Sequence, residues 1–398
     1  MAVYDRDIGT RERALHTSRR LRIGVYNTEF HQRGGGEKRA LVLAEHWTTH
    51  HDVVVVSHAG IDVAALARYF SVVLDDVRTV ALADVRGANP DSIELAELRW
   101  TALRDLNLDV FVNASYGSTA VNPAPLGIYM CMFPVPERPD SDPYARAPQR
   151  SSDQEQTGVH AWLDSYDAIT ANSAFTARHI ESRWSRVAVP VFTPCSPVPS
   201  GVKEKLILNV ARFDPYKRQD ALITAFQASD SLRREGWSLY LVGSMAGTPR
   251  DRQYVDALIS QAGDDRVSVL PDVSRRDLED LYGRAAIYWH ATGFEAGLVD
   301  NPERHEHFGQ TVVEAMSAGA VPVVLDAGGP AETVEHSVSG FRWSTSRELI
   351  SYSEQLVLHA DLRHRMSRRA IDASRAFTPA EFCRRMDAVL DGLVGGSA

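Results

Sequence analysis

The sequence has few cysteines, and their spacing suggests no pairing. Cys131, Cys195 and Cys383 lie far apart in a chain of 398 residues, and no CxxC motif occurs. This spacing suggests neither a disulfide framework nor a zinc site. We therefore expect a reducing, cytoplasmic setting.

Lysine is also scarce. Of the 43 basic residues only those at positions 38, 203, 205 and 217 are lysines, and all the others are arginine. The bias is typical of a genome rather than of a function. Each lysine that is kept is nevertheless a candidate for closer inspection.

Long apolar runs are absent. No uninterrupted stretch approaches the ~18 to 20 residues of a membrane span, and the N-terminus lacks the apolar core of a signal peptide. Residues 1–20 are polar and arginine-rich, which predicts a flexible tail, with weak contact to anionic lipid as the alternative. We expect at most peripheral contact with the inner face of a membrane. The net charge of −9 argues against nucleic acid as a partner.

The length favours two domains of roughly 150 to 200 residues. Short β-branched runs alternate with loops and with segments of helical period, which predicts parallel sheets covered by helices. The expected strands are 21–26, 52–57, 71–74, 109–113, 128–132, 168–170, 206–210, 238–242, 267–270, 286–290 and 320–325, and the clearest helices are 37–47, 174–184 and 220–228. The predicted fold class is α/β, with two doubly wound Rossmann-like domains facing each other across a cleft.

A proline-rich stretch between residues 189 and 200 interrupts this alternation and is typical of an interdomain linker. We expect a first domain over 21–190, a linker over 191–202, a second domain over 203–376 and a closing helix over 377–398. The polar segment 137–158 is long enough to be a lid or a disordered loop.

The glycine cluster Gly34–Gly36, followed by Glu37, separates the first expected strand from its helix. Glycine lets backbone amides approach a ligand closely, and the helix N-terminus favours an anion such as phosphate. A nicotinamide site is the alternative, but GxGxxG would need glycine where Arg39 stands. Ser57 and His58 also replace the acidic residue expected after the second strand. A merely tight turn is the remaining alternative.

Two cations, Arg212 and Lys217, follow the strand expected over 206–210. A guanidinium fork and an ammonium five residues apart can both reach one diphosphate. Without a metal, a departing nucleotide diphosphate needs about this much positive charge. The alternative is a solvated basic loop.

Two carboxylates, Glu306 and Glu314, stand on either side of a helix start predicted near Gly309. The first amides of a helix are unpaired, and its dipole favours a phosphate there. Glu314 falls in a strongly apolar helix, where a carboxylate needs partners such as sugar or ribose hydroxyls. The alternative for Glu314 is an outward-facing position on an amphipathic helix.

Two patterns resemble metal motifs. Asp140-Ser141-Asp142 copies a DxD motif but lies in a proline-rich polar loop, so we interpret it as coincidence. His305 and His307 flank Glu306 and could be joined by His290 and His31, but HExxH spacing and cysteine support are both missing. We expect no metal site and no cofactor.

Four segments together resemble the motif series of family-four retaining glycosyltransferases, which have the GT-B fold. They are Gly34 to Glu37, Arg212 to Lys217, Glu306 to Glu314 and Ala327-Gly328-Gly329-Pro330-Ala331-Glu332. The similarity runs from about Leu21 to the C-terminus. The Glu-His-Phe-Gly form of the third motif resembles members that transfer mannose from GDP-mannose to lipid-linked sugars. The closing segment, with Phe377, Phe382 and Met386, is similar to the family's last helix, which crosses back onto the first domain.

The resemblance implies a retaining, metal-independent hexosyltransferase that uses a GDP- or UDP-linked sugar as substrate. The acceptor would be a hydroxyl of a sugar, a lipid-linked sugar or a small molecule. Arg212 and Lys217 would bind the donor diphosphate and stabilise its departure. Glu306 would bind the transferred sugar and Glu314 the ribose. The resemblance implies further donor contacts at Gly34, Gly35, Val273, Phe308, Gly309 and Gln310.

The expected acceptor side departs from the family pattern. Many members have a histidine before Phe-Pro at the end of a first-domain strand, whereas Met132 stands there in this sequence. Ser115 and Tyr116, which follow the strand 109–113, are further candidates for the acceptor side. Two alternatives stay open: a GT-B epimerase or phosphorylase, and an inactive module that binds a nucleotide sugar.

Overall fold

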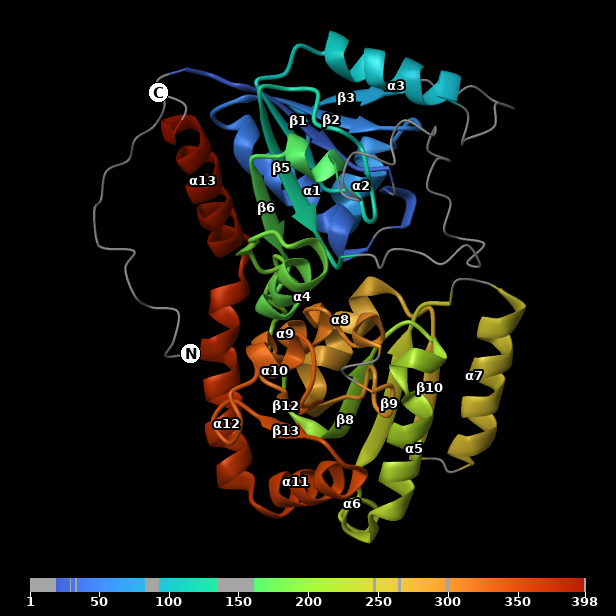
Figure 1. Ribbon diagram of the computed structural model, residues 1–398. Coiled ribbons are helices and arrows are strands. Elements are labelled where there is room, and N and C mark those ends of the chain that lie inside the picture. The colour runs from blue at the N-terminus through green and yellow to red at the C-terminus, as the bar shows by residue number, and fades with distance from the viewer. Residues whose placement is uncertain are drawn as a thin grey trace.

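The computed structural model describes residues 19–28, 30–32, 34–82, 93–134, 161–245, 248–263, 266–297 and 301–396. Two parallel sheets, each covered by helices, form two domains stacked one above the other in Figure 1. The predicted α/β class and the pair of doubly wound domains are confirmed.

The first sheet has the strand order β3-β2-β1-β4-β5-β6-β7, and every neighbouring pair is parallel. Its strands are β1 (Arg22–Tyr26), β2 (Asp52–Ser57), β3 (Arg78–Ala81), β4 (Val110–Asn113), β5 (Leu126–Cys131), β6 (Ala168–Ala171) and β7 (Val189–Pro190). The associated helices are η1 (Phe30–Gln32), α1 (Gly35–Thr48), α2 (Val63–Phe70), α3 (Ile93–Asp105), η2 (Ala161–Ser165) and α4 (Ala174–Trp184). The valines of β2 are all buried, because helices cover both faces of the sheet, and the strand is therefore a continuous apolar run in the sequence.

The second sheet has the order β10-β9-β8-β11-β12-β13, again all parallel. Its strands are β8 (Glu204–Val210), β9 (Ser238–Gly243), β10 (Val267–Pro271), β11 (Ala285–His290), β12 (Val321–Leu325) and β13 (Phe341–Trp343). Its helices are η3 (Pro215–Lys217), α5 (Gln219–Ala228), α6 (Asp230–Arg234), α7 (Pro249–Ala262), α8 (Arg275–Arg284), η4 (Pro302–Arg304), α9 (Gln310–Ser317), α10 (Pro330–Thr333), α11 (Ser346–Leu358) and α12 (Ala360–Ser374). The chain ends in η5 (Arg375–Phe377) and α13 (Pro379–Gly396).

One expected strand is wrong. Residues 71–74 form no strand, because Ser71 takes the left-handed conformation (φ 56°) and caps the C-terminus of α2. Val72 and Leu74 are buried in the core of the first domain without pairing to a neighbouring strand. The strand follows later, as β3, where only one of four residues is even half-buried.

The predicted helix 174–184 is confirmed as α4, and its ends have clear causes. The Ser173 hydroxyl accepts a hydrogen bond from the Thr176 amide, which satisfies one of the free amides of the first turn. Ser185 ends the helix in the left-handed conformation, and its amide donates to the carbonyl of Glu181.

The proline-rich connection between the two domains is largely buried. Val191, Cys195 and Val198 are inaccessible to solvent. The Cys195 amide donates to the Phe377 carbonyl at 2.8 Å, and the Val198 amide donates to the Ser317 hydroxyl at 2.9 Å. This connection therefore packs against α9 and η5, between the two domains.

The last helix returns to the first domain, as the resemblance implies. Figure 1 shows α12 beside the second domain and α13 beside the first. Phe382, Met386 and other residues of α13 complete the apolar core beneath α1. The carboxylate of Asp387 accepts hydrogen bonds from His46 and from the Trp47 indole, both at 2.8 Å.

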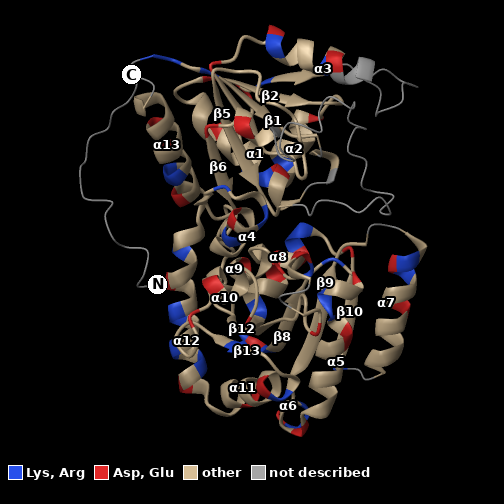
Figure 2. Ribbon diagram, in the orientation of Figure 1, with Lys and Arg blue, Asp and Glu red and all other residues tan. Residues whose placement is uncertain are grey.

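Charged contacts join the domains on the side of α4. Glu332, in α10, accepts a hydrogen bond from the Ala174 amide at 2.8 Å and pairs with Arg178 at 3.1 Å. Arg183 pairs with Glu303 at 3.0 Å. Figure 2 shows acidic and basic segments interspersed over both domains, with basic residues on α4 and at the start of α8.

Several expectations concern residues outside the described ranges. The greater part of the N-terminal tail, the polar segment 137–158 and its Asp140-Ser141-Asp142 motif belong to this group. Among the helices that the structure describes, none is both long and apolar enough to cross a bilayer.

Candidate functional site

Lys217 and Glu306 meet at the carboxyl edge of the second sheet. Lys217 ends η3, a short turn capped by Asp214, whose carboxylate accepts the Tyr216 amide at 2.9 Å. The Lys217 ammonium lies 2.7 Å from Glu306 Oε2, and both side chains are partly exposed. The structure thus joins two predicted site residues that are 89 positions apart.

His290, the last residue of β11, lies behind this pair. Its Nε2 atom is 3.9 Å from Glu306 Oε2. Burial lowers the pKa of His290, although Glu306 opposes this shift, so the ring is neutral near pH 7. Burial alone would raise the pKa of the Glu306 carboxyl, but Lys217 and His290 outweigh it and hold this pKa well below 4.5. The sequence did not predict a role for His290 beside Glu306. The one feature that could have indicated it is its position as a polar residue at the end of a buried strand.

Four residues after Glu306, α9 begins. Gly309 is its N-cap with a φ of 93°, a conformation that favours glycine. The amides of Gly309, Gln310 and Thr311 donate to no group within the described residues. Free amides and the helix dipole make this end suited to an anion. The Phe308 ring packs with Phe192 and Phe377.

A second glycine pair, Gly328-Gly329, packs against the segment from Glu306 to Phe308. The Gly329 amide donates to the Glu306 carbonyl at 2.8 Å. A Cβ at Gly328, where φ is 66°, would lie 2.2 Å from that same carbonyl oxygen, and a Cβ at Gly329 would lie 2.3 Å from the Cα of Phe308. The Gly328-Gly329 pair therefore packs directly against the backbone of Glu306 to Phe308 and leaves no space for a side chain.

The glycine cluster of the first domain faces the start of α9. A Cβ at Gly35 would lie 3.1 Å from Gln310 Oε1, so the two domains approach each other closely there. Gly34 is the N-cap of α1, and its amide donates to Glu37 Oε2 at 2.6 Å. Two helix N-termini, one from each domain, therefore meet at the interdomain boundary.

Glu314 is buried, with 3% of its surface exposed, so the outward-facing alternative is wrong. Its carboxylate accepts hydrogen bonds from the Tyr282 hydroxyl at 3.1 Å and from the side-chain amide of Gln310 at 3.2 Å. Arg275 lies 3.8 Å away. Binding of ribose by Glu314 stays a prediction. Tyr282 and Arg275, which sequence reasoning did not select, are part of this site.

Arg212 stands apart from the Lys217 pair. Its side chain is exposed just beyond β8 and forms no ion pair within the described ranges. Gly243 allows the close approach of this loop, because a Cβ there would lie 1.8 Å from the Ala211 carbonyl oxygen. The neighbouring Arg218 is already held by Asp220 and Glu295. Arg212 is therefore a cation available to a ligand.

Val273 lies in the loop between β10 and α8 and packs partly against the core that contains Tyr282. This is the carboxyl edge of the same sheet, where ligands of doubly wound folds bind. Contact of Val273 with a nucleotide base stays a prediction.

The three acceptor-side candidates differ in exposure. Ser115 is 2% exposed, and its hydroxyl bonds to that of Thr28 at 2.6 Å, so it fixes a loop instead of facing an open surface. Tyr116 is half exposed. The sulfur of Met132 would lie 2.8 Å from a Cβ at Gly36, which places this methionine against the glycine cluster.

The histidines near Glu306 differ in their surroundings. Within the described residues, no group of three or more His, Cys, Asp or Glu side chains is arranged to hold a metal ion. His305 fills the space over Gly293, where a Cβ would lie 2.5 Å from its Nδ1 atom. His307 instead contacts the first domain.

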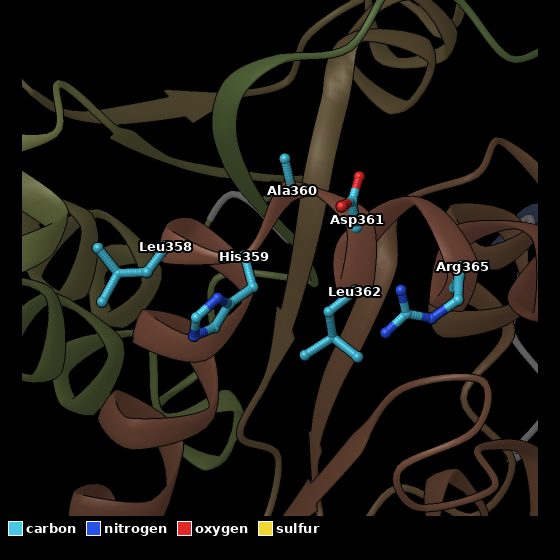
Figure 3. Close-up of a pocket in the computed structure, with 6 residues that line it drawn as sticks. All are labelled: Leu358, His359, Ala360, Asp361, Leu362 and Arg365. Carbon is cyan, nitrogen blue, oxygen red and sulfur yellow. The ribbon is translucent and has the colours of Figure 1, made fainter.

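A surface hollow of about 440 Å³ lies elsewhere, at the junction of α11 and α12. Its lining residues are Leu358, His359, Ala360, Asp361, Leu362 and Arg365 (Figure 3). It contains none of the predicted site residues, so we do not assign it to the candidate site.

Comparison with known proteins finds a family match for the second domain. Residues 197–373 match the family described as Glycosyl transferases group 1. The chain is 26% identical over 252 residues to a protein of Dictyostelium discoideum named GDP-Man:Man(3)GlcNAc(2)-PP-Dol alpha-1,2-mannosyltransferase, a match covering 58% of this chain and 48% of that protein. It is 29% identical over 258 residues to a Neurospora crassa protein of the same name, covering 56% and 44%. The chain thus matches less than half the length of these relatives.

Among solved structures, Anabaena HepE in complex with UDP and glucose is similar in fold. The TM-score is 0.69 at 16% identity, covering 94% of this chain and all of that one. The similarity in structure assigns the chain to the GT-B fold. More particularly, residues 197–373 match the group 1 glycosyltransferases, in agreement with the resemblance carried by the motifs.

Proposed function

We propose that the protein transfers a hexose from a nucleotide diphosphate sugar to a hydroxyl acceptor, with retention of configuration and without a metal ion. The observation that carries this proposal is the ion pair of Lys217 and Glu306 at 2.7 Å. This ion pair holds a phosphate-binding cation next to a sugar-binding carboxylate. Glu306 also lies three residues before Gly309, where the free amides at the start of α9 begin.

The chain offers the donor diphosphate several positive groups. Lys217 and Arg212 supply full charges, and the amides of Gly309 and Gln310 supply the partial charge of a helix N-terminus. Gly34 and Gly35 line the same region from the first domain, next to the side chains of Glu37 and Gln310. Such fixed positive groups stabilise the charge that develops on a departing diphosphate.

The reaction needs no protein nucleophile. The bond between the anomeric carbon and the diphosphate oxygen breaks, and its electron pair leaves with the diphosphate. The acceptor hydroxyl attacks the anomeric carbon from the same face, and its proton passes to a departing phosphate oxygen. The ionised Glu306 accepts hydrogen bonds from hydroxyls of the sugar and so orients it.

GDP-mannose is the first donor to test, because two relatives carry GDP-Man in their names. Those names also include a lipid-linked acceptor, which supports a lipid-linked sugar as the first acceptor to test. Contact between the β10–α8 loop at Val273 and the base would set the choice between GDP and UDP.

The test begins with binding. GDP, UDP and ADP are added separately to the purified chain, and the melting temperature is measured. Binding of the correct diphosphate at a hundred times its Kd stabilises the folded state by about 2.7 kcal/mol, a readily measured shift. If none of the three raises the melting temperature, the proposal is wrong.

Turnover separates transfer from mere binding. Release of nucleoside diphosphate from GDP-mannose and UDP-glucose is followed with water, mannose or a lipid-linked sugar as acceptor, with and without EDTA. NMR of the product gives the anomeric configuration. Binding without release would favour an inactive module, release that requires phosphate would favour a phosphorylase, and loss of activity in EDTA would contradict the metal-independent step.

A further inference from the structure

Three of the four lysines of the chain have partners. Lys203 donates to the carbonyls of Tyr282, Gly283 and Ala318 at 3.3, 2.8 and 2.6 Å. Lys205 donates to a carbonyl at 2.7 Å, and Lys217 pairs with Glu306. Buried ammonium groups normally require such partners, because removal from water is costly.

Lys38 is the exception. It lies in the second turn of α1 with only 6% of its surface exposed. Its ammonium makes no hydrogen bond and no ion pair with any residue in the described part of the chain. The Lys38 Nζ atom is not among the fully buried side-chain atoms without a partner, so the ammonium of this otherwise buried residue reaches accessible space, where an anion can bind it.

The geometry of α1 shows where this ammonium lies. Gly35 faces the Thr193 methyl group and the Gln310 side chain, and Arg39 donates to the Val191 carbonyl. Residues three and four positions apart share one face of a helix, so Lys38 lies on this face, toward the interdomain connection and α9. Helical side chains also lean toward the helix N-terminus, which carries the Lys38 ammonium back toward the glycine cluster.

Cys195 gives independent support for this position. Its sulfur lies 3.9 Å from the Gln310 carbonyl, in the first turn of α9. Burial raises the pKa of the Cys195 thiol, Glu314 raises it further, and Lys38 lowers it. The charges of Lys38 and Glu314 therefore both act on the Cys195 thiol, which lies between α1 and α9.

We propose that Lys38 is a further cation of the diphosphate site, contributed by the first domain, and that its ammonium binds the phosphates of the donor. This inference rests on the proposed function, since the anion is the diphosphate of a nucleotide sugar held at the start of α9. The diphosphate would then contact cations of both domains, Lys38 from one side and Lys217 from the other.

The test compares the nucleoside diphosphate that wild-type protein binds best, among GDP, UDP and ADP, with its monophosphate. Calorimetry gives both Kd values for wild type and Lys38→Met. Loss of one charged hydrogen bond should weaken diphosphate binding roughly tenfold to hundredfold and monophosphate binding less than about threefold. Without ligand, the melting temperature of Lys38→Met should stay close to that of wild type, because the Lys38 ammonium has no hydrogen bond or ion pair to lose within the described residues.

Two lysine variants serve as controls. Lys203→Met should lower the melting temperature of the free protein without changing the affinity ratio of diphosphate to monophosphate, because Lys203 only satisfies carbonyls. Lys205→Met, at an exposed site, should change neither quantity. Lys38→Gln repeats the test with a polar neutral side chain, should the methionine variant fold poorly.

The possible failures are distinct. Wild-type protein that binds none of the three diphosphates overturns the proposed function and this inference together. Wild-type binding with an unchanged affinity ratio in both Lys38 variants overturns the inference alone. Equal loss of diphosphate and monophosphate binding, with a lower melting temperature, would show that Lys38 has a structural role only.

Discussion

His307 of the second domain stacks on Phe133 of the first, with 4.1 Å between the ring centroids and 10° between the ring planes. Phe133 follows β5, and His307 immediately follows Glu306. Burial lowers the pKa of His307 to about 4; Glu306 opposes this shift, and Lys217 adds to it. A neutral ring therefore lies flat against the phenyl group at the boundary between the domains.

This contact predicts a pH dependence of stability. Above pH 6.5 His307 is neutral in both the folded and the unfolded chain. Between pH 6.5 and 4 the unfolded chain takes up a proton that the folded chain does not, so the free energy of unfolding falls as the pH falls. In His307→Asn this contribution is lost, and we expect a smaller slope between pH 6.5 and 4 in urea denaturation. The exposed His359→Asn is the control, and identical slopes for His307→Asn and wild type would contradict the prediction.

Lys217→Ala should reduce the turnover number by about two to three orders of magnitude, the loss typical for removal of one preorganised positive group. The fold should survive, because Lys217 is partly exposed and its turn is capped by Asp214. Release of nucleoside diphosphate at saturating donor gives the turnover number, and far-UV circular dichroism checks the fold. A well-folded Lys217→Ala protein with wild-type turnover would refute the assigned role, and Lys205→Ala is the matched control.

Gly328→Ala should destabilise the protein by about 2 kcal/mol or more, since its backbone is left-handed and the new Cβ meets the Glu306 carbonyl. The displaced Glu306 should also lower activity. Gly392→Ala, in α13 with open space around it, should instead stabilise the protein by about 0.5 to 1 kcal/mol. Urea denaturation measures both changes. An unchanged free energy of unfolding in Gly328→Ala would show that the packing of the glycine pair does not support the Glu306 to Phe308 backbone.

Glu332→Ala should loosen the domain contact. It removes the acceptor of the Ala174 amide at the start of α4 and the partner of Arg178, a loss of about 1 to 2 kcal/mol. We expect a larger radius of gyration in small-angle X-ray scattering of the free protein. Glu235→Ala, which removes a surface carboxylate within the second domain, should leave the scattering unchanged. Equal scattering from all three proteins would mean that Glu332 does not hold the domains together.

Much of the fold could be predicted from the sequence, because most strands are buried on both faces and appear as short β-branched runs. The strands that were missed are β3, β7 and β13, with four, two and three residues. β3 is mostly exposed and polar, so it lacks an apolar run. The polar helix α8 was missed for a similar reason, since only its last turns are buried.

The candidate site was partly predictable for a topological reason. Lys217 and Glu306 both follow buried strands, and the carboxyl ends of parallel strands share one edge of a sheet. His290, Arg275 and Tyr282 could not be selected in the same way, because their roles depend on distances to Glu306 and Glu314 that no local pattern encodes. The buried state of Lys38 likewise depends on the interdomain packing of α1.

The return of α13 has a consequence for synthesis on the ribosome. Phe382, Met386 and Leu390 fill the core beneath α1, and Asp387 binds His46 and Trp47, more than 300 positions earlier in the chain. The rest of the first domain leaves the exit tunnel well before α13 and lacks part of its core until α13 has been synthesised. Folding of the first domain is therefore completed by α13, and shortening the chain at Pro379 would leave an apolar groove on the first domain open.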